Sequence, residues 1–219
     1  MATRTEAESG RRPPGETATR ILDIAEELVQ VRGFNGFSYA DVARRLKITN
    51  ASLHYHFHAK ADLGSALVER YRRRFIESLG AIDHEAGRAD ARLAAYVRLY
   101  ADVFRSQRMC LCGMLAAEYQ TLPAGMQELI VDFFDENESW LARVLEEGAS
   151  EGSLALDGPP RERARALIGG LEGAMLVARP YDDVERFSAI ASQLTSGLAA
   201  RADGSGAAAT AMDEFSRRA

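Results

Sequence analysis

Cysteine is scarce in this chain, with two among 219 residues, and so few argue against a disulfide framework. No apolar run approaches the roughly 20 residues that a membrane-spanning helix needs. The N-terminal segment MATRTEAESGRRPPGETA lacks the apolar stretch of a signal peptide. These absences predict a cytoplasmic protein without a membrane partner.

Familiar catalytic motifs are missing as well. The sequence contains no nucleophile elbow, no phosphate-cradling glycine loop and no HExxH motif, and it has only four histidines. Strand-like alternation of apolar and polar residues is also missing, whereas helical periodicity recurs throughout. We therefore predict an all-α protein that is not an enzyme and needs no cofactor or metal.

Charge is unevenly distributed along the chain. The net charge is −5, but residues 1–75 carry 13 Lys and Arg against 9 Asp and Glu, and residues 76–219 carry 14 against 23. The basic excess near the N-terminus suits phosphate binding. One run of arginines is interpreted as a solvated helix face with a spacing role, phosphate contact being the alternative. It consists of Arg70, Arg72, Arg73 and Arg74.

Residues 37–63, FSYADVARRLKITNASLHYHFHAKADL, have the pattern of two short helices joined by a tight turn, with a third helix just behind. Ser38 can cap the first short helix and Thr49 the second. Leu53 and Phe57, four residues apart, face the core. This is the layout of a helix-turn-helix DNA reader, and it predicts a three-helix DNA-binding head.

The second short helix leaves small and polar side chains for solvent or for the base edges of a major groove. These side chains are Asn50, Ser52, His54 and His56. A metal site is the alternative, because His54 and His58 would lie one helical turn apart.

A family resemblance rests on Ser38, Val42-Ala43, Leu46 and above all Ser52-Leu53-x-Tyr55-His56-Phe57-x-x-Lys60-x-x-Leu63. These residues resemble the N-terminal signature of the TetR family of bacterial transcriptional repressors. The preceding segment Thr19-Arg20-Ile21-Leu22-Asp23, with the glycine stop Arg32-Gly33-Phe34, is similar to the family's first helix.

Three departures from the family pattern stand in the same segment: His54 replaces tyrosine, Lys47 replaces a turn glycine, and His58-Ala59 replaces Pro-Ser. Lys47 needs a left-handed or bridge backbone conformation, which glycine adopts more readily. Ala59 has no side-chain oxygen to cap the next helix, which costs about 1 kcal/mol relative to serine.

The resemblance implies which side chains touch DNA. Ser38 and Tyr39 would hold a backbone phosphate, together with Lys60, which matches the family's phosphate-contacting lysine. Asn50 is a candidate for adenine readout and Ala51 for a thymine methyl group. Tyr55 is either a core residue or a backbone contact. The predicted DNA-binding residues are Ser38, Tyr39, Asn50, Ala51, Ser52, His54, Tyr55, His56 and Lys60.

Apolar stripes at helical spacing continue through the rest of the chain. They predict a long connecting helix after Leu63, a break around residues 84–90, and a stop at Pro123. By resemblance, the last two helices, about 161–179 and 183–201, pair with their copies in a homodimer, and packing within one subunit is the alternative. We divide the chain into a disordered arm (1–16), the helix-turn-helix head (17–63), a larger helical regulatory and dimerisation domain (64–201) and a disordered tail (202–219).

Aromatic and sulfur-containing side chains of the regulatory domain suit a pocket for an apolar or aromatic effector, although each is also a candidate for core packing. They are Tyr96, Tyr100, Phe104, Cys110, Cys112, Met114, Tyr119, Phe133, Phe134 and Trp140. Cys110 and Cys112 are either reactive thiols or small buried hydrophobes. The segments Cys110–Glu118 and Leu171–Ala174 resemble the C-terminal domain of the LmrA/YxaF-like TetR subgroup.

The resemblance therefore implies a dimeric repressor that binds a palindromic DNA operator and is released by a small apolar or electrophilic effector. Two alternatives stay open. One is a regulator that senses oxidants or electrophiles through cysteine, and the other is an activator that answers to no ligand.

Overall fold

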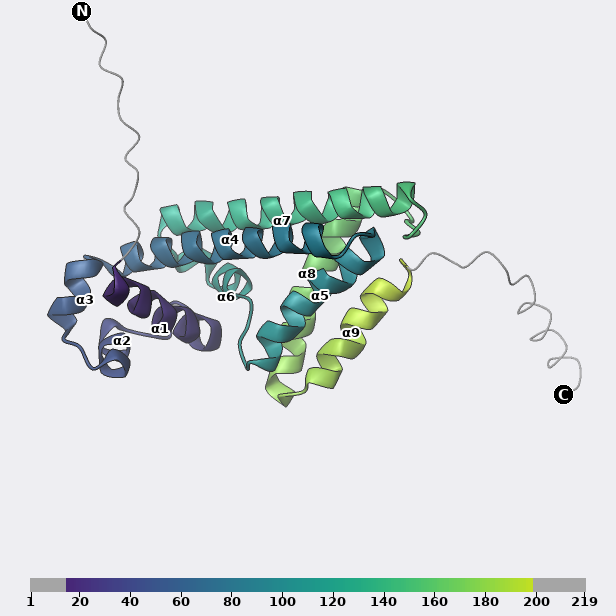
Figure 1. The fold of residues 1–219 in the computed structure, drawn as a ribbon. Coiled ribbons are helices and arrows are strands. Elements are labelled where there is room, and N and C mark those ends of the chain that lie inside the picture. The colour runs from purple at the N-terminus through teal and green to yellow at the C-terminus, as the bar shows by residue number, and fades with distance from the viewer. Residues whose placement is uncertain (1–14, 199–219) are drawn as a thin grey trace, which may run out of the picture. The chain divides into compact units, whose positions relative to one another are not determined.

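The computed structural model describes residues 15–198, and within that range every regular element is a helix. The all-α prediction is confirmed. Residues 1–14 and the tail from residue 199 lie outside the described residues, and so does the disorder predicted there. The predicted disordered arm reached residue 16, but Glu16 is the first residue of α1, so the arm was drawn too long at that position. The elements are α1 (Glu16–Arg32), α2 (Tyr39–Leu46), α3 (Asn50–His56), α4 (Lys60–Glu85), α5 (Ala89–Arg105), α6 (Leu111–Ala117), η1 (Tyr119–Thr121), α7 (Ala124–Ser150), α8 (Pro160–Ala178), η2 (Arg179–Tyr181) and α9 (Val184–Ser196) (Figure 1).

The chain forms two compact units. Unit 1 contains residues 1–76 and 103–134, and unit 2 contains residues 77–102 and 135–219. The divisions fall inside α4, α5 and α7, each of which runs from one unit into the other. The predicted domains meet at residues 63 and 64, but the compact units divide elsewhere. The predicted boundary therefore stays a prediction about function.

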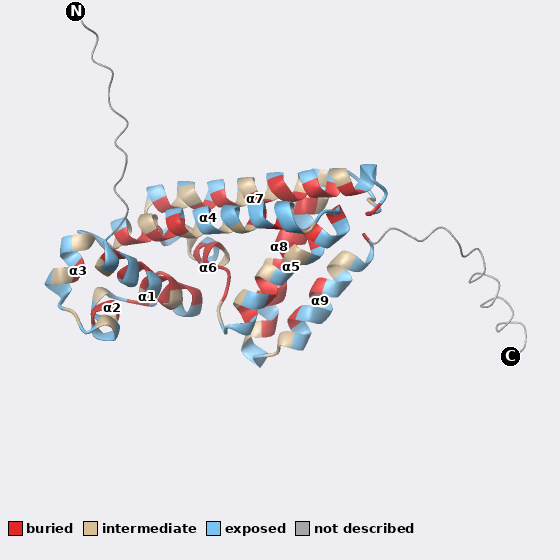
Figure 2. Cartoon of the chain, in the orientation of Figure 1, coloured by how far each residue is buried: buried red, intermediate tan, exposed pale blue. Residues whose placement is uncertain are grey.

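The three helices of the head (α1 to α3) belong to unit 1. The inner face of α1 carries Ile21, Ala25 and Leu28, all buried at the helical spacing expected of an amphipathic helix. Buried Val42 in α2 and Leu53 in α3 complete this small core. Figure 2 shows the same alternation along the long helices, where buried and exposed residues recur in turn.

Helix starts in the head follow the sequence signals. The Asp41 carboxylate accepts hydrogen bonds from the Ser38 backbone N–H (2.8 Å) and hydroxyl (2.7 Å) at the start of α2. Thr49 Oγ1 accepts from the Ser52 N–H (3.1 Å), which confirms Thr49 as the cap of α3. At the start of α4, Ala59 supplies no side-chain cap, but the Asp62 carboxylate accepts from the Ala59 N–H (2.9 Å).

Lys47 ends α2 in a left-handed conformation, with φ 56° and ψ 41°. This confirms the backbone conformation expected at the position where relatives carry glycine. The α2–α3 turn therefore keeps the helix-turn-helix geometry at the expense of local strain.

Unit 2 contains the paired helices α8 and α9, which lie side by side (Figure 1). Gly170 permits their close approach, because a Cβ there would lie 2.7 Å from the methyl carbons of Leu194. None of the helices in the described residues is long and apolar enough to cross a membrane.

Candidate nucleic-acid interface

Helix α3 presents an exposed row of side chains over a single buried anchor. Leu53 is fully buried, whereas Asn50, Ala51 and His54 are exposed. Tyr55 is 80% exposed, so the alternative that placed it in the core is wrong. Ser52 and His56 are half-buried. A short helix with small and hydrogen-bonding groups on its free face has the shape and chemistry that a major groove accepts.

The His54 ring is held by neighbours within the head. It packs on the Tyr39 ring at a centroid separation of 4.8 Å, and its Nδ1 lies 3.0 Å from the His58 carbonyl oxygen. Helix α3 ends at His56, so His54 and His58 do not share a helix face. The geometry on which the alternative metal site depended is therefore not formed.

Tyr39 ties α2 to the end of α3. Its phenol donates a hydrogen bond to the Phe57 carbonyl oxygen at 3.0 Å. Burial, reinforced by the negative charge of Asp62, raises the pKa of Tyr39 to about 12. The phenol thus stays protonated, and its one proton is already used inside the head. A phosphate contact by this hydroxyl stays a prediction that requires the bond to Phe57 to be exchanged.

Lys60 points back into the head. Its ammonium donates to the carbonyl oxygens of Phe34 and Phe37, both at 2.6 Å, and lies 4.5 Å and 4.3 Å from the centroids of their rings. Burial lowers the pKa of Lys60, although the charges of Glu118 and Asp41 oppose this shift. Its predicted phosphate contact therefore depends on the third ammonium proton or on a rearrangement.

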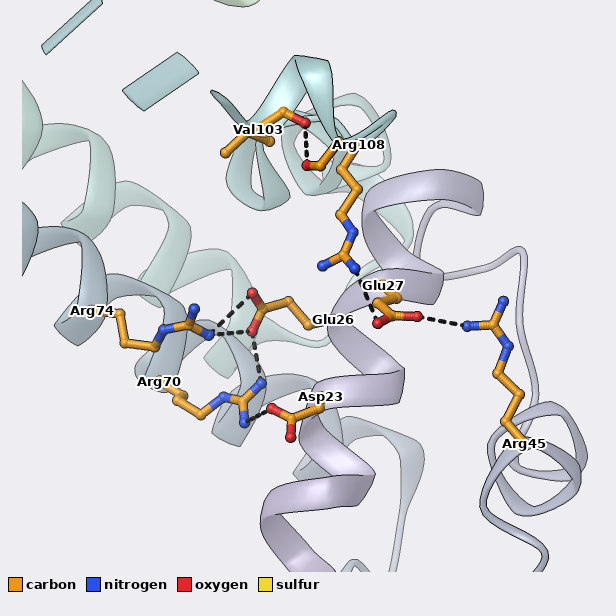
Figure 3. A network of polar contacts seen from close by, with 9 residues as sticks. Asp23, Glu26, Glu27, Arg45, Arg70, Arg74, Val103 and Arg108 are labelled. Carbon is orange, nitrogen blue, oxygen red and sulfur yellow. Dashed lines mark hydrogen bonds and ion pairs between the residues drawn. The ribbon is translucent and has the colours of Figure 1, made fainter. Parts of the chain in front are cut away.

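The arginines of α4 form a network of ion pairs with α1 (Figure 3). Arg70 is buried and pairs with Glu26 at 2.7 Å and with Asp23 at 2.8 Å, and Arg74 also reaches Glu26 at 3.1 Å. The interpretation of this run as a solvated face is wrong for Arg70. The periodicity of α4 alone could not predict these ion pairs, because the acidic partners of the arginines lie on α1.

Glu27 extends the same network to two further segments of unit 1. It accepts from Arg45 of α2 at 2.9 Å and from Arg108, in the connection between α5 and α6, at 3.0 Å. Acidic side chains of α1 therefore join this helix by charge to α2, α4 and the α5–α6 connection (Figure 3).

The predicted effector residues in unit 1 form part of its apolar interior. The Phe133 ring contacts the rings of Phe75 and Phe134 at centroid separations of 5.0 Å and 5.2 Å. Cys110 and Cys112 are both buried and form no disulfide. Phe104 is buried as well, and Met114 and Tyr119 are half-buried.

The remaining predicted effector residues lie in unit 2 around a buried amide that the sequence analysis missed. Tyr96 donates to Asn137 Oδ1 at 2.8 Å, and Asn137 Nδ2 donates to the Tyr100 hydroxyl at 3.2 Å. The Tyr96 ring stacks on Trp140 at 5.5 Å, and the indole N–H donates to Asp83 at 3.0 Å. Asn137 interrupts the apolar stripe of α7, and a polar residue at a core position was the signal that could have found it.

These features define a helix-turn-helix DNA-binding protein. The family model described as bacterial regulatory proteins, tetR family, matches residues 21–67, and the model described as tetracyclin repressor-like, C-terminal domain, matches residues 89–194. A TetR family regulator from Agrobacterium tumefaciens is 32% identical and superposes with a TM-score of 0.81, covering 84% of this chain and 97% of that one. A TetR regulator from Legionella pneumophila is 29% identical with a TM-score of 0.76, covering 85% and 100%.

The transcriptional regulator AcuR of Cereibacter sphaeroides is 26% identical over 163 residues, which are 73% of this chain and 74% of the relative. The chain belongs to the TetR family of bacterial transcriptional regulators. Members of this family bind DNA and form dimers, and the family is one of regulators rather than enzymes.

Proposed function

We propose that this protein is a dimeric, ligand-responsive transcriptional repressor that binds a palindromic operator and works in the cytoplasm, where bacterial DNA lies. The observation that carries the proposal is the exposed row of α3 over the buried anchor Leu53. Asn50 is a candidate for adenine readout, Ala51 packs against a thymine methyl group, and Tyr55 contacts the backbone or a base edge. Ser38, Tyr39 and Lys60 position the head on phosphates, Tyr39 by exchanging its hydrogen bond to Phe57 and Lys60 through its third ammonium proton.

An apolar patch on α8 and η2 supports dimerisation through the last two helices. Leu176, Val177 and Tyr181 are 60%, 54% and 63% exposed, which is unusual for side chains of this size. Gly169 and Gly173 lie on the same helix, and among the described residues a Cβ at either would meet no atom within 4 Å beyond the adjoining backbone of α8. Small residues beside exposed apolar ones suit close packing against a second copy of α8 and α9.

The regulatory domain supplies the effector site. Its aromatic interior favours a small apolar or aromatic effector, and a polar atom of that ligand would exchange with the hydrogen bonds that join Tyr96, Asn137 and Tyr100. Both cysteines are buried, which favours this effector over sensing through a reactive thiol. The likeness of the segments around residues 110–118 and 171–174 supports placement in the LmrA/YxaF-like subgroup.

A gel shift on the intergenic DNA that flanks the protein's own gene tests this function. At moderate salt with excess nonspecific competitor, we expect a discrete band that resists competition. Asn50→Ala should lower the specific affinity by about tenfold, since one bidentate base contact contributes about 1–3 kcal/mol. Gln120→Ala, an exposed amide outside α3, is the matched control and should bind like the wild type. Equal loss in both variants would contradict readout by α3.

A further inference from the structure

The α1–α2 turn, residues 33–37, is held from both sides by groups of opposite charge. Its backbone N–H groups face a carboxylate, and its carbonyl oxygens face an ammonium. All the residues concerned belong to unit 1. The arrangement joins the reading head to the α6–η1 segment, which lies within the C-terminal family match rather than the N-terminal one.

The carboxylate is that of Glu118, the residue that ends α6. Its Oε2 accepts from the Phe34 N–H at 2.5 Å, and both of its oxygens lie 3.3 Å from the Asn35 N–H. The Asn35 side-chain amide also donates to Thr121 Oγ1 at 2.7 Å, and this hydroxyl donates to the Glu118 carbonyl oxygen at 2.8 Å. Two consecutive backbone groups and one side chain of the turn are thus bound to residues 118–121.

Gly33 makes room for this carboxylate. A Cβ at this position would lie 2.6 Å from Glu118 Oε1 and 2.9 Å from Glu118 Cδ. The backbone φ of +80° is itself one that other residues rarely adopt. Glycine is therefore required here both by conformation and by the close approach of Glu118.

The ammonium is that of Lys60, the first residue of α4 and only four residues beyond the end of α3. It donates to the Phe34 and Phe37 carbonyl oxygens at 2.6 Å, and thus binds the acceptor groups of the turn whose N–H groups Glu118 binds. The turn therefore connects Glu118, at the end of α6, to Lys60, which lies just after α3 at the start of α4. Charge-assisted hydrogen bonds at both ends make this bridge stiffer than apolar packing alone.

We propose that Glu118 is a positioning residue for DNA binding, which couples α6 to the orientation of α3 through the α1–α2 turn. The inference rests on the proposed DNA-binding function. A displacement of α6 carries the Glu118 carboxylate with it, and the turn must either follow or lose its N–H partners. Without the carboxylate the turn fluctuates, and DNA binding must order it again.

Glu118→Gln in the full-length protein tests this role, because the amide keeps the shape but removes the charge and one acceptor oxygen. The matched control is Glu128→Gln, an exposed carboxylate in unit 1. Three quantities are measured: amide hydrogen exchange at Phe34 and Asn35, affinity for the operator fragment, and the midpoint of thermal unfolding. We expect E118Q to speed exchange at both amides and to weaken operator binding, each by about tenfold, with the unfolding midpoint within a few degrees of wild type. E128Q should change none of the three.

Faster exchange with operator affinity unchanged would make Glu118 a local cap only and overturn the proposal. Unchanged exchange would show that the contact does not hold the turn, which overturns it as well. If the wild-type protein itself binds no operator, the DNA-binding function fails, and the exchange measurement still reports separately whether Glu118 holds the turn.

Discussion

At the scale of single residues, the head divides its polar side chains between internal bonds and a free surface. Tyr39 donates its hydroxyl proton to the Phe57 carbonyl oxygen, and Lys60 donates two of its three ammonium protons to the carbonyl oxygens of Phe34 and Phe37. Asn50 and Tyr55 stay exposed on α3. The first group fixes the angle between helices, and the second is available to DNA.

Lys60→Met should destabilise the protein by about 1–3 kcal/mol, because it removes two hydrogen bonds from a charged donor and leaves two carbonyl oxygens to find water. Methionine keeps the apolar length of the side chain and its packing against the phenylalanine rings. Urea unfolding of the variant measures the loss. Lys47→Met, at an exposed position, is the matched control and should change stability by less than about 0.5 kcal/mol. A K60M variant as stable as K47M would contradict the internal role of Lys60.

Residues with local partners were predictable from sequence, and residues with distant partners were not. Thr49 caps its own helix, and Lys47 takes the left-handed conformation that its place in the turn requires, so spacing sufficed for both. Lys60, Glu118 and Arg70 bind groups 23 to 84 residues away. No periodicity records such pairings, because they depend on how helices meet in space.

At the scale of elements, carboxylates with lowered pKa values tie the helices of unit 2 together. Burial alone would raise the pKa of Asp83, but hydrogen bonds from Trp140 and Arg143 outweigh it and lower the pKa. A hydrogen bond from Arg165 lowers the pKa of Glu138 on α7, linking that helix to α8. These ion pairs act between helices rather than along one.

Stability should therefore fall in acid. A carboxyl whose pKa is lower in the folded state stabilises the fold above its unfolded pKa of about 4, and this contribution is lost as the pH falls through the folded value. We expect the thermal midpoint to stay level from about pH 7 to 5 and to drop below about pH 4. Circular dichroism melts across this range measure it. Asp83→Asn should be less stable at neutral pH and lose less on acidification, and an equal loss in both proteins would contradict the role of Asp83.

The helices themselves followed from the sequence, since apolar residues three and four apart predict them whatever their partners. The stop at Pro123 and the break around residues 84–90 both appear, because η1 ends at Thr121, α4 ends at Glu85 and α5 begins at Ala89. The partners of Asn137 could not be predicted, because its amide bonds to Tyr96 and Tyr100, which lie on another helix. The sequence predicted the stripe but not the polar cluster within it.

At the scale of the whole molecule, the proposed function requires two copies of the chain. Leu176→Glu places a charge in the exposed apolar patch of α8, and burying that charge in a dimer would be costly. We expect the wild type to be a dimer by light scattering and L176E to be a folded monomer at micromolar concentration. Val131→Glu, an exposed apolar position on α7, is the control and should remain dimeric. If L176E is still a dimer, the dimer interface does not include this patch of α8, and the proposed interface is contradicted.

A DNase I footprint on the intergenic fragment tests most directly that a pair of α3 helices reads a symmetric operator. Because two reading helices on a two-fold axis meet one face of the duplex, we predict two protected half-sites with centres about 10 base pairs apart or a multiple of that distance. Protection should be lost with Asn50→Ala at the concentration that protects with wild type. Protection of a single asymmetric site, or protection unaffected by Asn50→Ala, would contradict operator recognition by the paired helices.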